Sequence, residues 1–179
     1  DENEKILHQL NFVKEILNHK IPYLGICLGL QVLVKAAGGS IVKCTTKEIG
    51  FLDHEKNQFT VNLTEEGKED PLFDGLGTSF KVFHLHGETV ELTNDMILIA
   101  IGKFCKNQIV RIGNNAYGIQ SHFELTEEMF IEWCKKDPDL IQLDYHELYI
   151  IYKNLKMEYE VTGLKLFENF LKITSFNLI

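Results

Sequence analysis

The stretch Tyr23-Leu24-Gly25-Ile26-Cys27-Leu28-Gly29-Leu30-Gln31 places a cysteine between two glycines at the end of an apolar run. The apolar run at 21–26 predicts a short strand, and the apolar periodicity of 28–37 predicts a helix. A strand joined to a helix through G-x-C-x-G has the layout of a nucleophile elbow, a tight turn that lifts one side chain above a sheet. The stretch therefore predicts an α/β fold with Cys27 at the carboxyl end of a strand.

The chemistry expected of Cys27 follows from that turn. Glycine is expected on either side because the turn leaves no room for Cβ atoms. The helix that follows directs its N-terminal N–H groups and its positive dipole end toward the sulfur, which favours the reactive thiolate. The alternative is a buried structural cysteine on a strand-to-helix turn, and the motif alone leaves both interpretations open.

A second segment, Tyr117-Gly118-Ile119-Gln120-Ser121-His122-Phe123-Glu124, predicts a short strand that ends in a His-x-Glu pair. Residues two apart on extended backbone point to the same side, so the Glu124 carboxylate is placed to orient the His122 imidazole. A cysteine nucleophile needs such a base, and the base needs such an orienting group. The alternatives are an ordinary loop histidine at 122 and an acid at 124 that serves only the start of the next helix.

Together the two segments resemble the signature of the class I (triad) glutamine amidotransferases, G-x-C-x-G-x-Q followed much later by G-x-Q-x-H-x-E. The segments between them are similar to the branch of that family that includes the amidotransferase domain of GMP synthase. The segment Lys47-Glu48-Ile49-Gly50 is similar to the glutamine-pocket segment of the family. The segment Val82-Phe83-His84-Leu85-His86-Gly87-Glu88 is similar to H-x-H-G-D of the branch, and Cys105-Lys106-Asn107-Gln108 is similar to its C-x-N-Q. The tail at 166–171 resembles the stand-alone members, so the resemblance covers nearly the whole chain.

The resemblance implies a flavodoxin-like fold with a mostly parallel central sheet flanked by helices. Residues 1–179 are then a single glutamine amidotransferase domain, in which 139–179 form a helical C-terminal extension. Three departures from the family pattern are evident. Glu88 stands where the branch usually has Asp, and Phe123 stands where it usually has Pro. Family members also carry early strands and a Gly-Gly loop that supplies part of the oxyanion hole, which we expect upstream of Asp1 in the natural protein.

The resemblance also implies a reaction, the hydrolysis of the side-chain amide of glutamine through a glutamyl thioester on Cys27. In that reaction His122 is the general base and acid, Glu124 orients it, and the Leu28 N–H is an oxyanion donor. The implied glutamine pocket contains Gly29, Gln31, Glu48, His86, Gly87 and Glu88. The alternative for Glu48 is a strand-edge charge, and the alternative for 86–88 is an ordinary strand-end turn.

The implied partner is a synthetase or other acceptor protein, which would receive the released ammonia. A γ-glutamyl peptidase or hydrolase on the same machinery is the first alternative. A non-catalytic relative that uses the fold for binding is the second.

Composition and charge limit the partners, cellular location and cofactors that we expect for the protein. A net charge of −8 over 179 residues disfavours nucleic acid and anionic membranes as partners. No apolar run is long enough to cross a bilayer, and no signal peptide is evident. The four cysteines form no C-x-x-C pair. We therefore expect a cytoplasmic protein with free thiols. Neither H-E-x-x-H nor a cysteine cluster is present, so we predict no metal site and no cofactor, with Cys44, Cys105 and Cys134 as small core residues.

The remaining pattern predicts the other elements of the domain. We expect helices at 4–19, 125–135 and 139–173, the last broken near 144 and 163, and strands at 40–44, 58–63, 80–85, 96–101, 108–112 and 116–120. A turn-rich connector is expected at 64–77 and a hairpin turn at 113–115. The aromatic stripe of 139–173 predicts a core face or a helix–helix seam, and a homodimer surface stays open as an alternative.

Overall fold

The computed structural model of the chain describes residues 2–175. Its helices are α1 (Glu2–Asn18), α2 (Leu28–Ala36), α3 (Glu65–Lys68), α4 (Glu127–Lys136) and α5 (Tyr145–Ile173), with 3-10 turns at Pro71–Phe73 and Leu140–Gln142. Its strands are β1 (Tyr23–Ile26), β2 (Ser40–Gly50), β3 (Thr60–Leu63), β4 (Ser79–Lys81), β5 (His84–Glu91), β6 (Met96–Ile101), β7 (Asn107–Ile112) and β8 (Ala116–Ile119).

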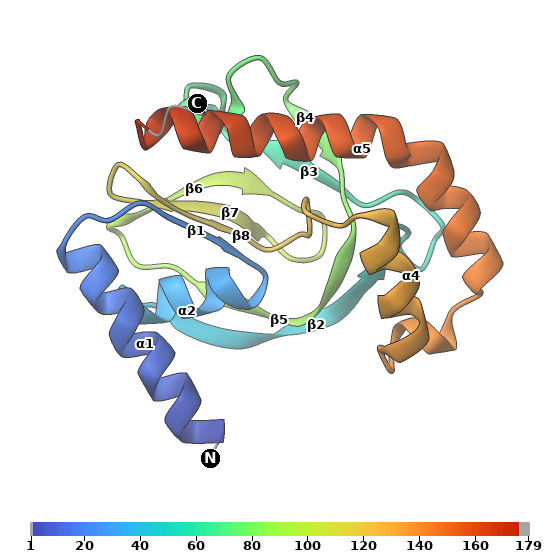
Figure 1. Cartoon of the computed structure of the whole chain (residues 1–179), viewed down its shortest axis with the longest axis horizontal. Coiled ribbons are helices and arrows are strands. Elements are labelled where there is room, and N and C mark those ends of the chain that lie inside the picture. The colour runs from blue at the N-terminus through green and yellow to red at the C-terminus, as the bar shows by residue number, and fades with distance from the viewer. Residues whose placement is uncertain (1, 176–179) are drawn as a thin grey trace.

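The strands form two separate sheets. A six-stranded sheet has the order β1-β8-β7-β6-β3-β4, and β2 pairs with β5 in a two-stranded ribbon. Figure 1 shows α5 along one side of the large sheet, with α2 and the β2–β5 ribbon on the other. The helices thus cover both faces of the sheet, as the sequence predicted.

The pairing of the large sheet differs from the expected one. β1 and β8 are parallel, in the register Tyr23↔Ala116, while the other described pairs of this sheet are antiparallel. The described sheet is therefore mixed rather than mostly parallel, and the hairpin turn predicted at 113–115 joins one of its antiparallel pairs, β7 and β8. β1 lies at one edge of this described sheet.

The β1–α2 turn has the predicted compact form. A Cβ atom on Gly25 would lie 2.5 Å from the carbonyl carbon of Gly29, so only glycine fits at this point of the strand. Leu30, Leu33 and Val34 of α2 are fully buried against the sheet and the ribbon. The first turn of α2 is held close to the end of β1, which fixes where Cys27 stands.

The predicted strand at 80–85 is divided between the two sheets. Its first part is β4, and its second part begins β5, which continues to Glu91 along a β2 that is itself longer than the predicted 40–44. The segment predicted as a pocket loop, 86–88, is consequently part of a strand. The connector at 64–77 contains α3 and a 3-10 turn.

The long C-terminal helix α5 runs unbroken for 29 residues. The break predicted near 144 is the start of this helix, where the Asp144 carboxylate accepts hydrogen bonds from the N–H groups of His146 and Glu147. The break predicted near 163 does not occur. A Cβ on Gly163 would lie 2.3 Å from the Phe123 carbonyl oxygen, so this glycine allows close packing rather than a bend.

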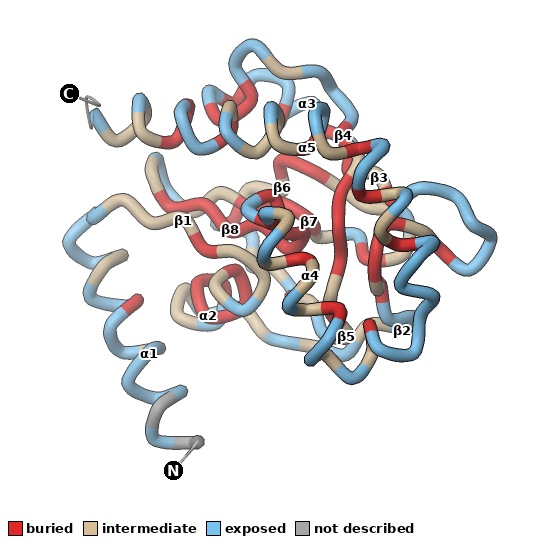
Figure 2. The backbone as a smooth tube through the Cα atoms, turned by 45° about the vertical axis from the view of Figure 1, so that its right-hand side comes forward, coloured by how far each residue is buried: buried red, intermediate tan, exposed pale blue. Residues whose placement is uncertain are grey.

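Burial concentrates in the sheet and along the faces that cover it (Figure 2). Leu166 and Phe170 of α5 share a core with Tyr117 and Ile119 of β8. The predicted apolar face of α1 is buried only in part, since Val13 is buried while Ile6 is 51% exposed. In the part of the chain that is described, no helix is both long and apolar enough to cross a membrane.

Candidate active site

Cys27 stands at the N-terminus of α2 in a strained backbone conformation. Its φ of 50° and ψ of −101° lie in a region that non-glycine residues rarely adopt. The Cys27 N–H still donates to the carbonyl of Ile119 at 2.7 Å, so the residue is tied to the end of β8 while its side chain leaves the strand. Backbone strain of this kind persists where the surrounding structure holds it, and it is typical of functional positions.

His122 and Glu124 follow β8 and lie beside Cys27. The His122 Nδ1 is 2.7 Å from Glu124 Oε1, and Cys27 lies close enough to the imidazole to raise its pKa. The His122 N–H donates to the carbonyl of Phe83 at 3.0 Å, which fixes the backbone that carries the ring. Cys27, His122 and Glu124, called the elbow group, are thus brought together as the sequence predicted.

The elbow group holds a proton on its histidine. Burial alone lowers the pKa of His122, but the hydrogen bond with Cys27 and the hydrogen bond and charge of Glu124 outweigh it and raise the pKa to about 9. Near neutral pH the imidazole is therefore cationic and able to donate a proton to a leaving group.

Aromatic side chains from the C-terminal helices support His122. The Trp133 ring of α4 packs edge-on against the imidazole with centroids 4.9 Å apart, and the Tyr159 hydroxyl of α5 donates to the His122 carbonyl. Sequence reasoning did not assign either residue to the site. The available signal was the aromatic stripe of the C-terminal segment, which indicated a packed face but not its neighbour.

Two further groups surround the sulfur of Cys27. The Gln120 Nε2 lies 3.8 Å from Sγ, and the Leu85 carbonyl oxygen of β5 lies 3.9 Å from it. Gln120 is fully buried, and its Oε1 has no hydrogen-bond partner among the described residues. Gln120 belongs to the motif that identified His122, although nothing in its spacing indicated a position next to the thiol.

The residues predicted to line a glutamine pocket fall into two sets. Leu28, Gly29 and Gln31 are on the first turns of α2, next to Cys27. The Gln31 Nε2 donates to the Glu88 carbonyl at 3.3 Å, so β5 meets α2 through backbone oxygen atoms. Gly87 lies beside the aliphatic part of Lys47, and the Glu88 side chain is exposed.

Glu48 and His86, the second set, lie in a buried group rather than around Cys27. Glu48 Oε2 is 3.0 Å from His86 Nε2 and accepts from Gln108 Nε2 at 3.2 Å. His84 Nδ1 is 3.2 Å from His86 Nε2, and burial followed by the charges of His86 and His122 lowers the pKa of His84 well below its usual value. This arrangement favours a neutral His84.

Five side chains around the ribbon meet the spacing needed to hold a metal ion. They form two overlapping sets whose ligand atoms lie within 4.8 Å of one another, Cys44, His86 and Cys105 in one and Glu48, His84 and His86 in the other. These five residues are called the ribbon cluster. Sequence reasoning predicted no metal site because they come from three separate chain segments without a local signature.

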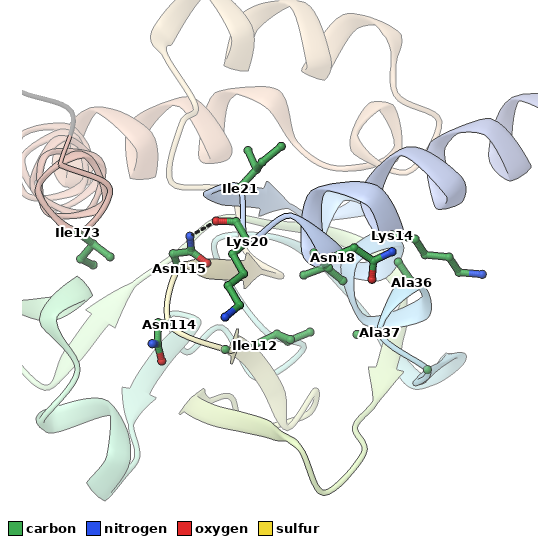
Figure 3. Close-up of a pocket in the computed structure, with 13 residues that line it drawn as sticks. Lys14, Asn18, Lys20, Ile21, Ala36, Ala37, Ile112, Asn114, Asn115 and Ile173 are labelled. Atoms are coloured by element: carbon green, nitrogen blue, oxygen red, sulfur yellow. Dashed lines mark hydrogen bonds between the residues drawn. The ribbon is translucent and has the colours of Figure 1, made fainter.

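A large cavity lies away from the elbow group. Its volume is about 960 Å³, and Lys14, Lys20, Gly38 and Asn115 are among its lining residues (Figure 3). Lys20 precedes β1, whereas Cys27 follows it, so this cavity opens at the opposite end of the strand. We assign it no part in the chemistry of the elbow group.

The chain is similar in sequence to proteins of one family. The model of the family "Glutamine amidotransferase class-I" matches residues 2–132. A glutamine amidotransferase-like protein of Salmonella typhimurium is 36% identical over 105 residues, which are 59% of this chain and 41% of that protein. One of the subunits of a glutamine-hydrolyzing GMP synthase from Sulfurisphaera tokodaii is 33% identical over 136 residues, which are 70% of this chain and 67% of that polypeptide.

A solved structure supports the same grouping. The crystal structure of a glutamine amidotransferase from Thermotoga maritima has a TM-score of 0.78 and 25% sequence identity, and the match covers 92% of this chain and 69% of that one. This match confirms the predicted fold class, an α/β sheet flanked by helices with a C-terminal helical element. The family match ends at residue 132, before the 3-10 turn that precedes α5.

Proposed function

The chain belongs to the class I glutamine amidotransferase family, and we propose that it hydrolyses the side-chain amide of glutamine to glutamate and ammonia at Cys27. The observation that carries this proposal is the elbow group. Its cysteine has the strained backbone of a nucleophile elbow, and its histidine lies near that cysteine, which raises its pKa, and 2.7 Å from a carboxylate oxygen. Nucleophile, base and orienting group are the three parts that covalent acyl transfer requires.

Each residue of the elbow group has one role in the proposed reaction. The Cys27 sulfur attacks the amide carbon, and the Leu28 N–H at the start of α2 donates to the developing oxyanion. His122 gives its proton to the departing ammonia, which leaves a glutamyl thioester on Cys27. Water then attacks the thioester while His122 takes up the proton, and glutamate and the free thiol are released. Glu124 orients the imidazole throughout.

The proposed pocket lies between the first turns of α2 and strand β5. Gln31 and the Glu88 carbonyl already form a hydrogen bond there, and the amino acid end of glutamine presents matching donors and acceptors. Gly29 and Gly87 leave the backbone accessible. Glu48 and His86 support this wall from behind through the buried hydrogen bonds of the ribbon cluster.

The ammonia is proposed to pass to an acceptor on another protein. Support comes from the relative in Sulfurisphaera tokodaii, whose name marks it as one subunit of a glutamine-hydrolyzing GMP synthase. A cytoplasmic location suits the free thiols of all four cysteines.

Residues 139–179 are proposed to be an extension of the same domain. The packing of Leu166 and Phe170 into the core of the large sheet supports this assignment, although the last four residues lie outside the described part of the chain. The exposed side of α5 also leaves a homodimer surface as part of the proposal, with Leu164 and Phe167 at least half exposed.

The test is an assay of glutamate release from glutamine by the purified chain and by its Cys27→Ala and Cys134→Ala variants. Cys134 is a buried thiol of α4 outside the elbow group, so its variant controls for the loss of a cysteine. We expect the Cys27 variant to fall to the uncatalysed background and the Cys134 variant to keep its rate. Glutamate release that survives in the Cys27 variant would overturn the proposal, and release from γ-glutamyl peptides in preference to glutamine would replace it with peptidase activity.

A further inference from the structure

Two thiols and one imidazole nitrogen converge at the edge of the β2–β5 ribbon. Cys44 Sγ lies 3.7 Å from His86 Nδ1, and Cys105 Sγ completes a set of three atoms within 4.8 Å of one another. Tetrahedral zinc, with bonds of about 2.3 Å to sulfur and about 2.0 Å to nitrogen, places neighbouring ligand atoms roughly 3.5 Å apart. The spacing found here is close to that of a tetrahedral site.

The carboxylate of Glu48 favours one tautomer of His86, and the tautomer determines which ring nitrogen has a lone pair for a metal ion. Glu48 Oε2 is 3.0 Å from His86 Nε2, and a carboxylate at that distance favours the proton on Nε2. The Nδ1 atom lies 3.7 Å from Cys44 Sγ and 3.2 Å from the Glu88 carbonyl oxygen, so a metal ion bound at Nδ1 would take the place of any hydrogen bond to that carbonyl. A carboxylate that holds the far nitrogen of a ligating histidine is a recurrent feature of zinc sites, since it orients the ring and raises its basicity.

The fold also fixes the second thiol. Cys105 lies between β6 and β7, in a loop that is tied to β5 by the hydrogen bond from Asn107 Nδ2 to the Val90 carbonyl at 2.7 Å. Gln108 Nε2 donates both to the Cys105 carbonyl and to Glu48, so one amide joins the loop to the carboxylate behind His86. The Thr89 hydroxyl lies 2.9 Å from Cys105 Sγ, where it is able to donate to a thiolate.

We propose that Cys44, Cys105 and His86 bind one Zn²⁺ ion through two thiolates and Nδ1, with a water molecule as fourth ligand. Two thiolates, a neutral imidazole and Zn²⁺ carry no net charge together, which suits a largely buried position. Cys44 is partly exposed, and it gives the metal and its water a path from solvent. The ion would fasten the β6–β7 loop to β2 and β5, behind the Glu88 carbonyl that meets Gln31.

The other set within the ribbon cluster fits a metal less well. Glu48 and His84 are each 1% exposed and His86 is 6% exposed, which leaves no route for an ion. Their ligand atoms already satisfy one another, at 3.0 Å between His86 and Glu48 and 3.2 Å between His86 and His84. Glu48 is therefore assigned as the orienting group for His86 and not as a ligand.

A disulfide between Cys44 and Cys105 is the competing outcome for these two thiols. Forming that disulfide removes two electrons from the pair of thiols and so requires an oxidant. Zinc needs no oxidant, because it displaces the thiol protons on binding. A metal ion therefore needs no further reactant at this site, whereas the disulfide does.

The test uses Co²⁺ as a spectroscopic probe for the zinc site, in the full chain purified with a reductant and a chelator that is then removed. The starting protein carries Cys27→Ser, so that the elbow group contributes no thiolate. We expect one Co²⁺ per chain, with a thiolate-to-cobalt charge-transfer band and the visible bands of a tetrahedral ion. Added Zn²⁺ should abolish these bands stoichiometrically.

Four further substitutions in this background decide the ligands. Cys44→Ser and Cys105→Ser should each lose the charge-transfer band and most of the affinity, while Cys134→Ser should keep both. Glu48→Gln should weaken Zn²⁺ binding by about 10–100-fold, the usual effect of removing an orienting carboxylate. If Cys105→Ser does not fold, Cys44→Ser at its partly exposed position decides by itself. Failure of the starting protein to bind Co²⁺, or undiminished binding by Cys44→Ser, would overturn the proposal without bearing on glutamine hydrolysis.

Discussion

Two regions of this molecule contain the same three residue types in contact and differ in almost every other respect. In the elbow group a cysteine meets a histidine that is held by a glutamate, and in the ribbon cluster Cys44 meets His86, which is held by Glu48. The carboxylate of the elbow group has a side chain that is 35% exposed, whereas that of Glu48 is 1% exposed. Residue types alone therefore do not distinguish a nucleophile site from a structural one.

The two regions differ in where the cysteine lies in the backbone and in what surrounds it. Cys27 lies at a helix N-terminus with positive φ, partly exposed to solvent, and its histidine is cationic at neutral pH. Cys44 lies on a strand where the β2–β5 register becomes irregular after Lys43, with a second thiol beside it. A helix N-terminus and a cationic partner are features that favour a reactive thiolate, which suits Cys27 to the attack on carbon that we propose. Two adjacent thiols facing one imidazole nitrogen are suited to bind a cation.

The largest effect should be the difference in thiol reactivity between the two regions. A glutamine-analogue electrophile should label Cys27 alone, because the helix N-terminus and the cationic imidazole act there, while burial raises the pKa of Cys44 and Cys105. Peptide mass mapping after partial labelling measures the ratio. The Cys27→Ala variant is the control and should take up no label. Labelling chiefly at Cys44 or Cys105 would reverse the comparison.

The second effect concerns the two partners of Cys27. His122→Ala should lower the rate of glutamine hydrolysis by about 10²–10⁴-fold, since the general base and acid is lost. Glu124→Gln should cost less, because the amide keeps the shape of the side chain and removes only its charge. Steady-state kinetics on both variants measures the two losses. Near-normal turnover by His122→Ala with Cys27 intact would show that the elbow group does not work as proposed.

The two halves of the elbow group were predictable because each is local, whereas their meeting depends on the parallel pairing of β1 with β8. Cys27 is placed by a turn of a few residues, and His122 and Glu124 are two apart on extended backbone, so spacing in the sequence determines spacing in the structure. The packing of Trp133 and Tyr159 on this group was not predictable, since α4 and α5 reach it only through tertiary contacts. No pattern within either helix indicates which histidine its aromatic face will meet.

The fold likewise has parts that were predictable from the local sequence and parts that were not. Helices α1, α2, α4 and α5 and the 113–115 hairpin were predicted from local periodicity and turn chemistry, whereas α3 lies in the segment predicted as a connector. The split of the 80–85 strand was not, because no turn residue interrupts the segment and the pairing of 84–86 with 48–50, which moves its second half to another sheet, joins residues distant in sequence. The ribbon cluster depends on that pairing. Its residues are brought together as a set that no single segment of the sequence contains.

The third prediction compares the two carboxylates for their effect on stability. Glu48→Ala should lower the free energy of unfolding by about 1–3 kcal/mol, because it leaves buried donors of His86 and Gln108 without an acceptor. Glu124→Ala should cost less than about 1 kcal/mol, since solvent reaches that pair. Urea denaturation in the presence of a chelator measures both, and Glu48→Gln, which keeps an acceptor, should fall between them. Equal losses at 48 and 124 would contradict the assigned difference in burial.

The smallest effect is a pH dependence of opposite sign in the two regions. His122 has its pKa raised from 6.5 to about 9 in the folded protein, so its contribution to stability is complete below pH 6.5 and is lost as the pH rises through 9. His84 has its pKa lowered from 6.5, so its contribution is present above pH 6.5 and is lost as the pH falls below that value. A substitution that weakens the effect of His122 should make stability fall less steeply above pH 6.5, and one that removes His84 should make it fall less steeply below pH 6.5.

The variants that separate these two sides are Glu124→Gln and His84→Gln. Glu124→Gln removes the charge that helps to hold the proton on His122, so the fall in stability between pH 6.5 and 9 should become shallower while the acid side is unchanged. His84→Gln removes a group that must gain a proton on unfolding, so the fall below pH 6.5 should become shallower while the alkaline side is unchanged. Denaturation midpoints across this range measure both slopes, and the ring signals of His122 in NMR spectra report its titration directly.

A His122 that titrates below about pH 7 in the native protein would mean that Cys27 and Glu124 do not stabilise the imidazolium. His122 would then first have to take the proton of the Cys27 thiol before it could protonate the departing ammonia.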